Sequence, residues 1–320
     1  MAVGIAAAVA AASALPLETE VDFNGNGISD LAVVRNVGGG SSGQVRWYLV
    51  DGATSSAVDW GIASDFFVPA DYDGDNITDV AVWRSGAAGV AAFYILQSST
   101  STLRVEVFGQ TGDDPTVVAD YDGDGRADPA VYRAGASAGA QSFWFYRGSL
   151  SNPGGNITYV PFGVNGDFPA PGDYDGDGRS DFAIQRNVGG QGVFFMLQST
   201  SGFATVPFGL PTDVIVPGDY DGDGRTDLAV IRGSGGTISW FIRQSSNLAV
   251  RYAVPFGASA TDFPSAADYD GDGRTDIGIW RTSATPGQSA FWYIRSSDSG
   301  VVVRPFGANG DYPLANFNTH

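Results

Sequence analysis

Short runs of β-branched and aromatic residues alternate along the chain with turns rich in Gly, Asp, Ser and Thr. In one stretch the apolar runs cover residues 65–70, 80–84, 92–97 and 103–109. Short runs of this kind, bounded by turn residues, are typical of strands, and no long stretch has the periodicity of an amphipathic helix. The pattern predicts an all-β protein in which this stretch forms four strands.

The four-strand unit recurs along the chain, and each copy has an acidic loop between its first and second strands. Loops one to six begin at Asp22, Asp71, Asp120, Asp173, Asp219 and Asp268. Their starts are separated by 49, 49, 53, 46 and 49 residues, and a period of this length is typical of a propeller or a solenoid. We therefore predict a six-bladed β-propeller with four strands in each blade, and we keep a seven-bladed ring or an open β-repeat as alternatives.

The two ends of the repeat region complement each other. Residues 311–316 copy the strand that precedes a loop, yet no loop follows them, whereas loop one lacks this strand and has Pro16 where the other repeats have Asp. We expect the C-terminal strand to complete the first blade and close the ring, which removes exposed sheet edges. The predicted domain is residues 16–317, preceded by an apolar segment 1–15 and followed by a tail 318–320.

Loops three to six follow the pattern D-x-D-G-D-G-x-x-D, and loops one and two are close variants of it. All six have oxygen-bearing side chains at positions 1, 3, 5 and 9. These side chains, with the backbone carbonyl of position 7, form the oxygen-only ligand set that Ca²⁺ prefers. The candidate ligands are, loop by loop, Asp22, Asn24, Asn26, Ile28 and Asp30; Asp71, Asp73, Asp75, Ile77 and Asp79; Asp120, Asp122, Asp124, Arg126 and Asp128; Asp173, Asp175, Asp177, Arg179 and Asp181; Asp219, Asp221, Asp223, Arg225 and Asp227; and Asp268, Asp270, Asp272, Arg274 and Asp276.

Up to six Ca²⁺ ions are expected, and loop one should bind most weakly because Asn replaces Asp at two of its ligand positions. An EF-hand is excluded, because position 12 is an apolar strand residue such as Val82 or Val131 where an EF-hand needs Glu. Position 6 is Gly in most loops, which suits a turn with positive φ, and Asn76 takes this place in loop two.

Composition agrees with acidic metal loops on a neutral scaffold. The net charge is −18, but four Asp in each of loops two to six and two in loop one account for 22 of the 35 acidic residues. A strongly acidic chain argues against a nucleic-acid partner. The chain has no Cys, so disulfides, thiol catalysis and Cys-rich zinc sites are excluded.

Three further features recur in the repeats. The fourth strand ends in Phe-Gly (Trp-Gly in the first repeat), an Asp lies six residues before loops two to six, and the second strand ends in Arg. The Asp residues are Asp65, Asp114, Asp167, Asp213 and Asp262, and the Arg residues are Arg35, Arg84, Arg133, Arg186, Arg232 and Arg281. We expect these Arg to pair with carboxylates or carbonyls between blades, with an anion site as the alternative.

Aromatic pairs recur on the third strand: Trp47-Tyr48, Phe93-Tyr94, Trp144-Phe145, Phe194-Phe195, Trp240-Phe241 and Trp292-Tyr293. One partner of each pair should pack against a neighbouring blade. Sugar stacking by exposed members is the alternative.

The Phe-Gly, the Asp-Gly loops and the repeat length resemble the FG-GAP/VCBS repeats of calcium-binding β-propellers, over about residues 16–317. Such repeats occur in integrin α-subunit heads, in some fungal propeller lectins and in many bacterial surface or secreted proteins. The resemblance implies that the Asp positions of all six loops hold Ca²⁺ in hairpins on one face of the propeller. It does not name a ligand, because one fold serves many functions.

The leading hypothesis is a secreted or cell-surface propeller that binds carbohydrate or a surface protein. Residues 1–15 are too short and too weakly apolar to span a membrane, and Ala12-Ser13-Ala14 fits a signal cleavage site. The same segment could instead dock into a neighbour, as in a structural subunit of an extracellular homopolymer or filament.

A polysaccharide-active lyase or hydrolase is the third hypothesis. The chain offers little for it, because its only His is His320 and its Glu residues are Glu18, Glu20 and Glu106. No catalytic residue is assigned. Asp51, Asp59 and Asp298 are the acids outside the repeated positions that such an enzyme would have to use.

Overall fold

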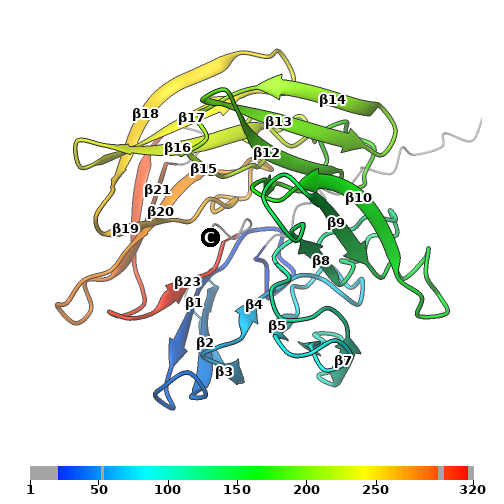
Figure 1. The fold of residues 1–320 in the computed structure, drawn as a ribbon. Coiled ribbons are helices and arrows are strands. Elements are labelled where there is room, and N and C mark those ends of the chain that lie inside the picture. Colours follow the sequence, from blue (N-terminus) through cyan, green and yellow to red (C-terminus); the bar gives the residue numbers. More distant parts are fainter. Residues whose placement is uncertain (1–20, 52–53, 295–298, 316–320) are drawn as a thin grey trace, which may run out of the picture.

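The computed structural model describes residues 21–51, 54–294 and 299–315, and these residues form six antiparallel sheets arranged as a ring (Figure 1). Each sheet is one blade. The short strand before the acidic loop lies nearest the centre, and the last strand of the repeat lies farthest out, as β4 and β7 do in Figure 1. The prediction of a six-bladed all-β propeller is confirmed.

Within each blade, the strands follow one another from the centre of the ring outward. Blade one contains β23 (Tyr312–Pro313), β1 (Leu31–Asn36), β2 (Gln44–Asp51) and β3 (Thr54–Ile62), and blade two contains β4 (Phe66–Phe67), β5 (Val80–Arg84), β6 (Ala92–Leu96) and β7 (Leu103–Val107). Blade three contains β8 (Ala130–Arg133), β9 (Gln141–Tyr146) and β10 (Thr158–Val164), and blade four contains β11 (Phe168–Pro169), β12 (Phe182–Val188), β13 (Gln191–Gln198) and β14 (Gly202–Pro207). Blade five contains β15 (Val214–Ile215), β16 (Leu228–Ser234), β17 (Thr237–Arg243) and β18 (Val250–Ala258), and blade six contains β19 (Asp262–Pro264), β20 (Ile277–Arg281), β21 (Ala290–Ile294) and β22 (Val301–Pro305).

The ring closes in blade one, where a strand from the C-terminal end completes a sheet from the N-terminal end. β23 pairs with β1, placing Tyr312 opposite Val34 and Pro313 opposite Val33. The amide of Leu314 donates to the carbonyl of Ala32 at 3.0 Å, which extends the pairing by one bond. The predicted closure by the C-terminal strand is confirmed.

Blade three has three strands because its innermost segment cannot form a regular ladder. Pro115 has no amide to donate, and the Asp114 carboxylate accepts hydrogen bonds from the amide and hydroxyl of Thr116. Only the bridge between Asp114 and Tyr132 remains of the fourth strand. The segment still follows the path of an innermost strand into loop three.

The hydrophobic core is divided among the six contacts between neighbouring blades. In the cluster between blades two and three, Trp83 and Phe93 pack with Val131 of the next blade, and each of the other five clusters likewise joins two adjacent blades. Trp47, Trp83, Trp144, Trp240 and Trp280 are fully or almost fully buried. Burial of such large side chains holds blade against blade.

In the third-strand aromatic pairs, the first ring is buried between blades and the second is half-buried in blades one to five. Blade six differs from the prediction by one residue. Its first buried ring is Phe291 and the half-buried ring is Trp292, so in the pair Trp292-Tyr293 the second ring, and not the first, packs against the neighbouring blade. Tyr293 is a second buried ring, which packs on Tyr269.

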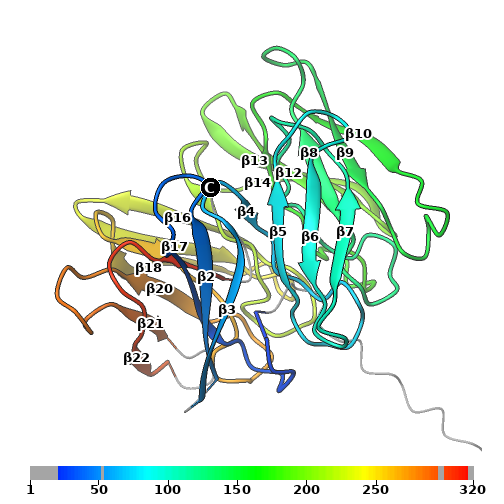
Figure 2. The same cartoon turned by 90° about the horizontal axis from the view of Figure 1, so that it is seen from below.

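The two ends of the innermost strand define the two faces of the propeller. In blade two, Asp65 precedes β4 and Arg84 ends β5, whereas loop two joins the opposite ends of the same two strands. Figure 2 shows β5, β6 and β7 side by side, running between the two faces. The acidic loops therefore lie on one face and the Arg side chains on the other.

Candidate metal centre

Each of loops two to six is a hairpin that is closed at its base by one β-bridge. The residue before position 1 pairs with the Asp at position 9, as Ala119 does with Asp128, and the same bridge occurs in loops two to six. The loop therefore protrudes from two strands whose separation is already fixed. Backbone pairing alone therefore brings positions 1 and 9 close together.

The carboxylate at position 1 shapes the turn. In loop three, Asp120 Oδ1 accepts from the amide of Gly123 at 2.6 Å and Oδ2 accepts from the amide of Gly125 at 2.8 Å. Equivalent pairs of bonds occur in the other loops. Position 6 has positive φ, which is 81° for Gly125 and 61° for Asn76.

The carboxylate at position 9 is completely buried in loops two to six. In loop three, Asp128 Oδ2 accepts from the amide of Tyr121 at 3.0 Å, and Oδ1 accepts from the amide of Ser149 at 3.3 Å. Burial raises the pKa of Asp128 to about 8, and the nearby Asp122 carboxylate adds to the effect. Burial likewise raises the pKa of Asp79 to about 6 and the pKa of Asp181 and Asp227 to about 7.

Position 3 supplies an oxygen that the protein leaves without a hydrogen-bond partner. The buried Oδ1 atoms of Asp73, Asp122, Asp175 and Asp221 have none. Asp122 as a whole is only 7% exposed. A buried carboxylate oxygen without a partner is costly, so its repetition in four loops needs a physical explanation.

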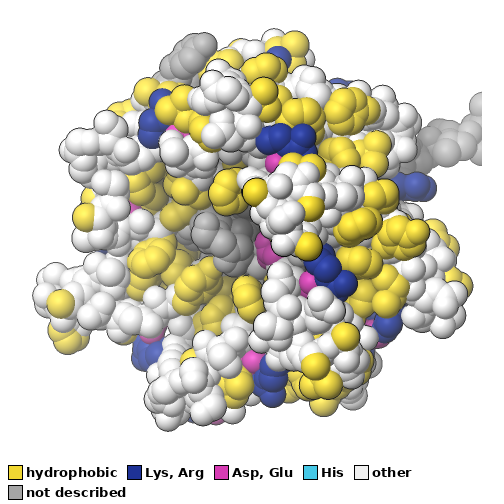
Figure 3. All heavy atoms as spheres, viewed as in Figure 1, with side chains coloured by type: hydrophobic (Ala, Val, Ile, Leu, Met, Phe, Trp, Pro, Cys, Tyr) yellow, Lys and Arg dark blue, Asp and Glu magenta, His cyan; other side chains and the backbone are white. Residues whose placement is uncertain are grey.

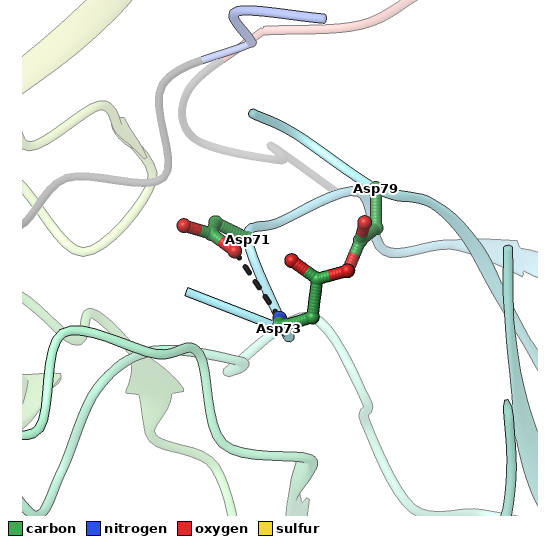
Figure 4. Close-up of side chains that lie close together, drawn as sticks. All are labelled: Asp71, Asp73 and Asp79. Carbon is green, nitrogen blue, oxygen red and sulfur yellow. Dashed lines mark hydrogen bonds between the residues drawn. The ribbon is translucent and has the colours of Figure 1, made fainter. Parts of the chain in front are cut away.

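Positions 1, 3 and 9 converge in loops two to six. In each of these loops one ligand oxygen from every side chain lies within 4.8 Å of the other two. Figure 4 shows this in loop two, where the Asp73 and Asp79 carboxylates point toward each other and Asp71 lies beside them. Buried carboxylates at this separation repel one another, and a divalent cation placed among them would relieve the repulsion.

The residues present therefore fit a hard divalent cation, and the unpartnered oxygen at position 3 is the observation that supports this. Asp at positions 1, 3 and 9 would hold the ion. The position-5 carboxylate is not part of the converging group. In loop two, Asp75 Oδ1 accepts from the amide of Ile77 at 2.9 Å and from the hydroxyl of Ser98 at 3.0 Å. Position 5 and the carbonyl of position 7 remain predicted ligands.

Sequence reasoning missed the Ser and Thr residues that support the loops from the turn between the third and fourth strands. Ser98 and Ser99 bond the carboxylates of loop two, and the following blades repeat the arrangement. The other donors are Ser149, Leu150 and Ser151 to loop three, Ser199, Thr200 and Ser201 to loop four, and Ser245 and Ser246 to loop five. The Ser/Thr pairs that follow the third strands of blades two, four and five were the available signal.

Loop one keeps the same backbone turn with different side-chain chemistry. The side-chain Nδ2 of Asn24 donates to Asp30 Oδ1 at 2.8 Å, and the backbone amide of Phe23 donates to Asp30 Oδ2 at 2.8 Å. With only two carboxylates, the loop contains no group of three acids like those in loops two to six. A hydrogen bond within the protein satisfies the oxygen that a cation would contact elsewhere.

The six loops bond to one another in a closed circle. The amide at position 8 of each loop donates to the carbonyl at position 1 of the preceding loop, each at 2.7 Å. The bonds run from Thr78 to Asp22, Ala127 to Asp71, Ser180 to Asp120, Thr226 to Asp173, Thr275 to Asp219 and Ser29 to Asp268. The last bond joins loop one to loop six, so the circle closes at the blades that the C-terminal strand also joins.

Part of the chain matches the model of a known protein family. Residues 219–279 match the model of the FG-GAP-like repeat, and they include all of loops five and six. The chain contains FG-GAP-like repeats. The other blades have the same strand order, loop position and interblade core as the matched residues.

Solved structures resemble the FG-GAP-like propeller in fold. TolB from Acinetobacter baumannii aligns with a TM-score of 0.56 and 15% identity over 89% of this chain, which spans 65% of the TolB chain. AofleA from Arthrobotrys oligospora aligns at a TM-score of 0.49 and 10% identity, covering 89% of this chain and 88% of its own. Aleuria aurantia lectin, solved with α-methyl-L-fucoside, aligns at 0.47 and 12%, covering 92% and 98%. At 15% identity, the TolB alignment supports a shared fold alone.

A search of curated proteins found no significant match. In the described part of the FG-GAP-like propeller, no helix is long and apolar enough to cross a membrane.

The Arg that ends the second strand of each FG-GAP-like repeat forms an ion pair with two hydrogen bonds. In blade four, Arg186 Nε and Nη2 bond the two oxygens of Asp167, each at 2.7 Å. The Arg side chains are 32–40% exposed and their Asp partners are at most 1% exposed. Pairing is thus confirmed, but the pairs lie within a blade, so the expectation of pairs between blades was wrong.

In blade three the partner is not the Asp that lies six residues before the loop. Arg133 pairs with Asp113, not Asp114, because the irregular entry into loop three contains one extra residue. In blade one the partner is Asp311, so this ion pair also joins the two ends of the chain. Each Arg lies over the half-buried ring of its blade: Tyr48, Tyr94, Phe145, Phe195, Phe241 and Trp292. On the face shown in Figure 3, several basic side chains lie next to acidic ones.

The remaining residues that the sequence analysis named are either paired with Arg or lie outside the described part of the structure. Asp59 forms an exposed ion pair with Arg46 at 2.6 Å, and Glu106 pairs with Arg104 and Arg147. The segment 1–15, the residues Glu18, Glu20, Asp298 and His320, and the side chain of Asp51 lie outside the described part of the structure. The alternatives that depended on them therefore stay as predictions.

Proposed function

We propose that the protein is a secreted or surface-displayed, calcium-stabilised propeller that acts as a binding or adhesion module. The observation that carries the proposal is the set of carboxylate oxygens at position 3, buried without a partner beside two further Asp side chains in loop after loop. A cation would bind these oxygens and neutralise the repulsion among them. The ion supplies charge and a cross-link between the strands of a blade, with no part in bond making.

Calcium is favoured over other metals because the loops offer oxygen donors only. An extracellular location follows from the same chemistry. Extracellular calcium modules bind with dissociation constants of about 0.1–1 mM, which suits sites made from one short loop. The chain has no Cys and so cannot use the disulfides that stabilise many secreted domains. Calcium in the interlinked loops would take over that role.

Binding is favoured over catalysis by how the remaining acids are used. Outside the loops, every acidic side chain described in the structure has an ion pair or a hydrogen bond. These residues are Asp59, Asp65, Glu106, Asp113, Asp114, Asp167, Asp213, Asp262 and Asp311. Carboxyls whose oxygens are already bonded to Arg are not free to exchange a proton with a substrate.

Carbohydrate is the first ligand class to test, because blades three and four expose aromatic rings on their outer strands. Tyr159 of β10 is 64% exposed and lies 6.4 Å from the ring of Phe145. Phe203 of β14 is 62% exposed and lies 6.3 Å from the ring of Phe195. Paired rings at the surface offer flat faces on which a sugar can stack, and a surface protein is the second class.

The test has two parts. Calorimetric titration of the chelated, desalted protein with CaCl₂ should give about five sites, and the melting temperature should rise with them. A glycan array is then probed with and without calcium, using Tyr159→Ser and Phe203→Ser as variants that leave the loops unchanged. Calcium binding with no glycan signal for any variant would redirect the ligand search to surface proteins. Absence of calcium binding would end the proposal.

A further inference from the structure

The side chain at position 7 of each loop lies on the loop of the preceding blade. Arg126 of loop three crosses Gly74 of loop two so closely that a Cβ on Gly74 would lie 2.8 Å from Arg126 Nε. The same contact is made all the way round the ring. The pairs are Arg126 on Gly74, Arg179 on Gly123, Arg225 on Gly176, Arg274 on Gly222, Ile28 on Gly271 and Ile77 on Gly25.

The covered glycine is position 4, which lies between two ligand positions. In loop two its neighbours are Asp73 and Asp75, so the covering residue lies next to the carboxylates of another blade. The amide of position 8 donates to the same preceding loop, for example from Ala127 to Asp71. The position-7 side chain therefore belongs, in space, to the site before its own.

The six contacts fall into two chemical kinds. Loops two to five are covered by Arg, whereas loop six is covered by Ile28 and loop one by Ile77. Among the described residues, none of the ion pairs within 4.0 Å involves the four covering Arg, namely Arg126, Arg179, Arg225 and Arg274. Their charge is therefore not committed to one carboxylate, although Arg179 also contributes, after Ser199 and Thr200, to lowering the pKa of Asp177 in its own loop.

We infer that position 7 of each loop sets the calcium affinity of the preceding loop, and that loop six is the tightest site. This inference rests on the proposed calcium binding. A guanidinium beside a carboxylate loop competes electrostatically with a divalent ion, whereas Ile28 carries no charge and shields the loop from water. Loop six combines four Asp with an uncharged cover, and its own Arg274 points away onto loop five.

The effect expected from one added or removed charge is on the order of tenfold in affinity. Loops two to five have four Asp beneath an Arg, so they form a weaker class. Loop one has an uncharged cover but only two Asp and remains the weakest. The affinities should therefore divide into one tight site, four weaker sites and one very weak site.

Calorimetric titration with CaCl₂ tests the order. The wild-type chain should show one tight site, and Asp270→Asn should remove it, which identifies it as loop six. Ile28→Arg should weaken the tight site by about tenfold, while Ile28→Met, which keeps an uncharged cover, should leave it unchanged. A tight site that survives Asp270→Asn, or that is unaffected by Ile28→Arg in a folded protein, overturns the inference.

The reciprocal substitution keeps the test decisive if Ile28→Arg fails to fold. Arg126→Met should convert loop two into a second tight site, whereas Arg126→Lys should not. The gain should shrink at about 1 M NaCl, where charges are screened over about 3 Å. Equal calcium sites in all these variants would reject the role of position 7 but keep the proposed function, whereas a complete absence of calcium binding would reject both.

Discussion

Loop one and loop three have the same backbone turn but satisfy their buried oxygens differently. In both, the position-1 carboxylate accepts amides from positions 4 and 6, and an Asp at position 9 lies at the base of the loop. In loop one the side-chain amide Nδ2 of Asn24 donates a hydrogen bond to Asp30 Oδ1. In loop three an Asp stands at position 3, its Oδ1 has no partner, and the pKa of the neighbouring Asp128 is raised to about 8.

The difference teaches that the backbone turn forms with either set of side chains, whereas a third carboxylate leaves a buried charge that a cation would neutralise. An Asn-to-Asp hydrogen bond brings a donor to the buried acceptor and leaves nothing for an ion to neutralise. Replacing that Asn by Asp makes the same backbone an electrostatically strained site until a cation arrives. A near match to the loop pattern is therefore a reliable sign of the fold and a weak sign of a metal.

The largest effect on stability is expected from removal of calcium. At ten times the dissociation constant a site adds about 1.4 kcal/mol, so five carboxylate loops add about 7 kcal/mol. Chelation should then lower the melting temperature by on the order of 10–15 °C. Differential scanning calorimetry with and without chelator gives the value. An unchanged transition would show that all six loops behave like loop one.

The second test varies pH in the metal-free protein. The pKa values of Asp79, Asp128, Asp181 and Asp227 are raised to between about 6 and about 8, above the unfolded value near 4. Such groups contribute stability that is fully present below about pH 4 and is lost as pH rises through the folded pKa values.

Without calcium the melting temperature should therefore fall between pH 5.5 and pH 8.5, by roughly 5 °C. With saturating calcium the fall should disappear. Asp128→Asn should reduce the fall, because its amide cannot ionise. A metal-free protein that becomes more stable over this range would contradict the assignment.

The third test exchanges the chemistry of the two loops. Asp122→Asn in loop three should raise the stability of the metal-free protein by about 1–2 kcal/mol, because a donor replaces a buried like charge, and should remove one calcium site. Asn24→Asp in loop one should do the reverse and create a site. Denaturant melts with and without calcium give both signs. Changes of the same sign in the two variants would break the comparison.

The smallest test concerns position 6, where loop two differs from loops three to six. Asn76 has φ of 61°, a conformation that costs any residue with a side chain more than Gly. Asn76→Gly should stabilise the protein by about 0.5–1 kcal/mol, and Asn76→Ala should destabilise it by about 1 kcal/mol. The two variants should have the same calcium stoichiometry, which separates backbone strain from ligand chemistry.

The fold was predictable because each blade repeats its strands, turns and loop within one period of the chain. The ring closure was also predictable, because the extra strand at residues 311–316 matches the strand missing before Asp22. The pairing of Arg133 was not. The recurring Asp six residues before loop three is Asp114, but Pro115 and the turn at Asp114 add a residue to the entry of loop three and bring Asp113 to the Arg.

The candidate site was predictable only within each loop. Side chains at fixed offsets in one hairpin converge by local geometry, so positions 1, 3 and 9 follow from spacing. The donors Ser98 and Ser149 come from another turn of the blade, and Arg126 comes from the next blade. Contacts of that kind depend on the tilt and packing of whole sheets, which the spacing of residues along one loop does not encode.

Closure of the ring by β23 also sets an order of events in folding. The strand that completes blade one follows all the other strands of the ring in sequence, so blade one cannot be completed until those strands have been synthesised. Until then, the faces of blades one and six that bury Val33 and Trp280 against each other remain open to solvent. Without a cation, such a chain has both an open seam and loops whose buried carboxylates repel one another. A cation bound in the loops would therefore favour closure of the ring.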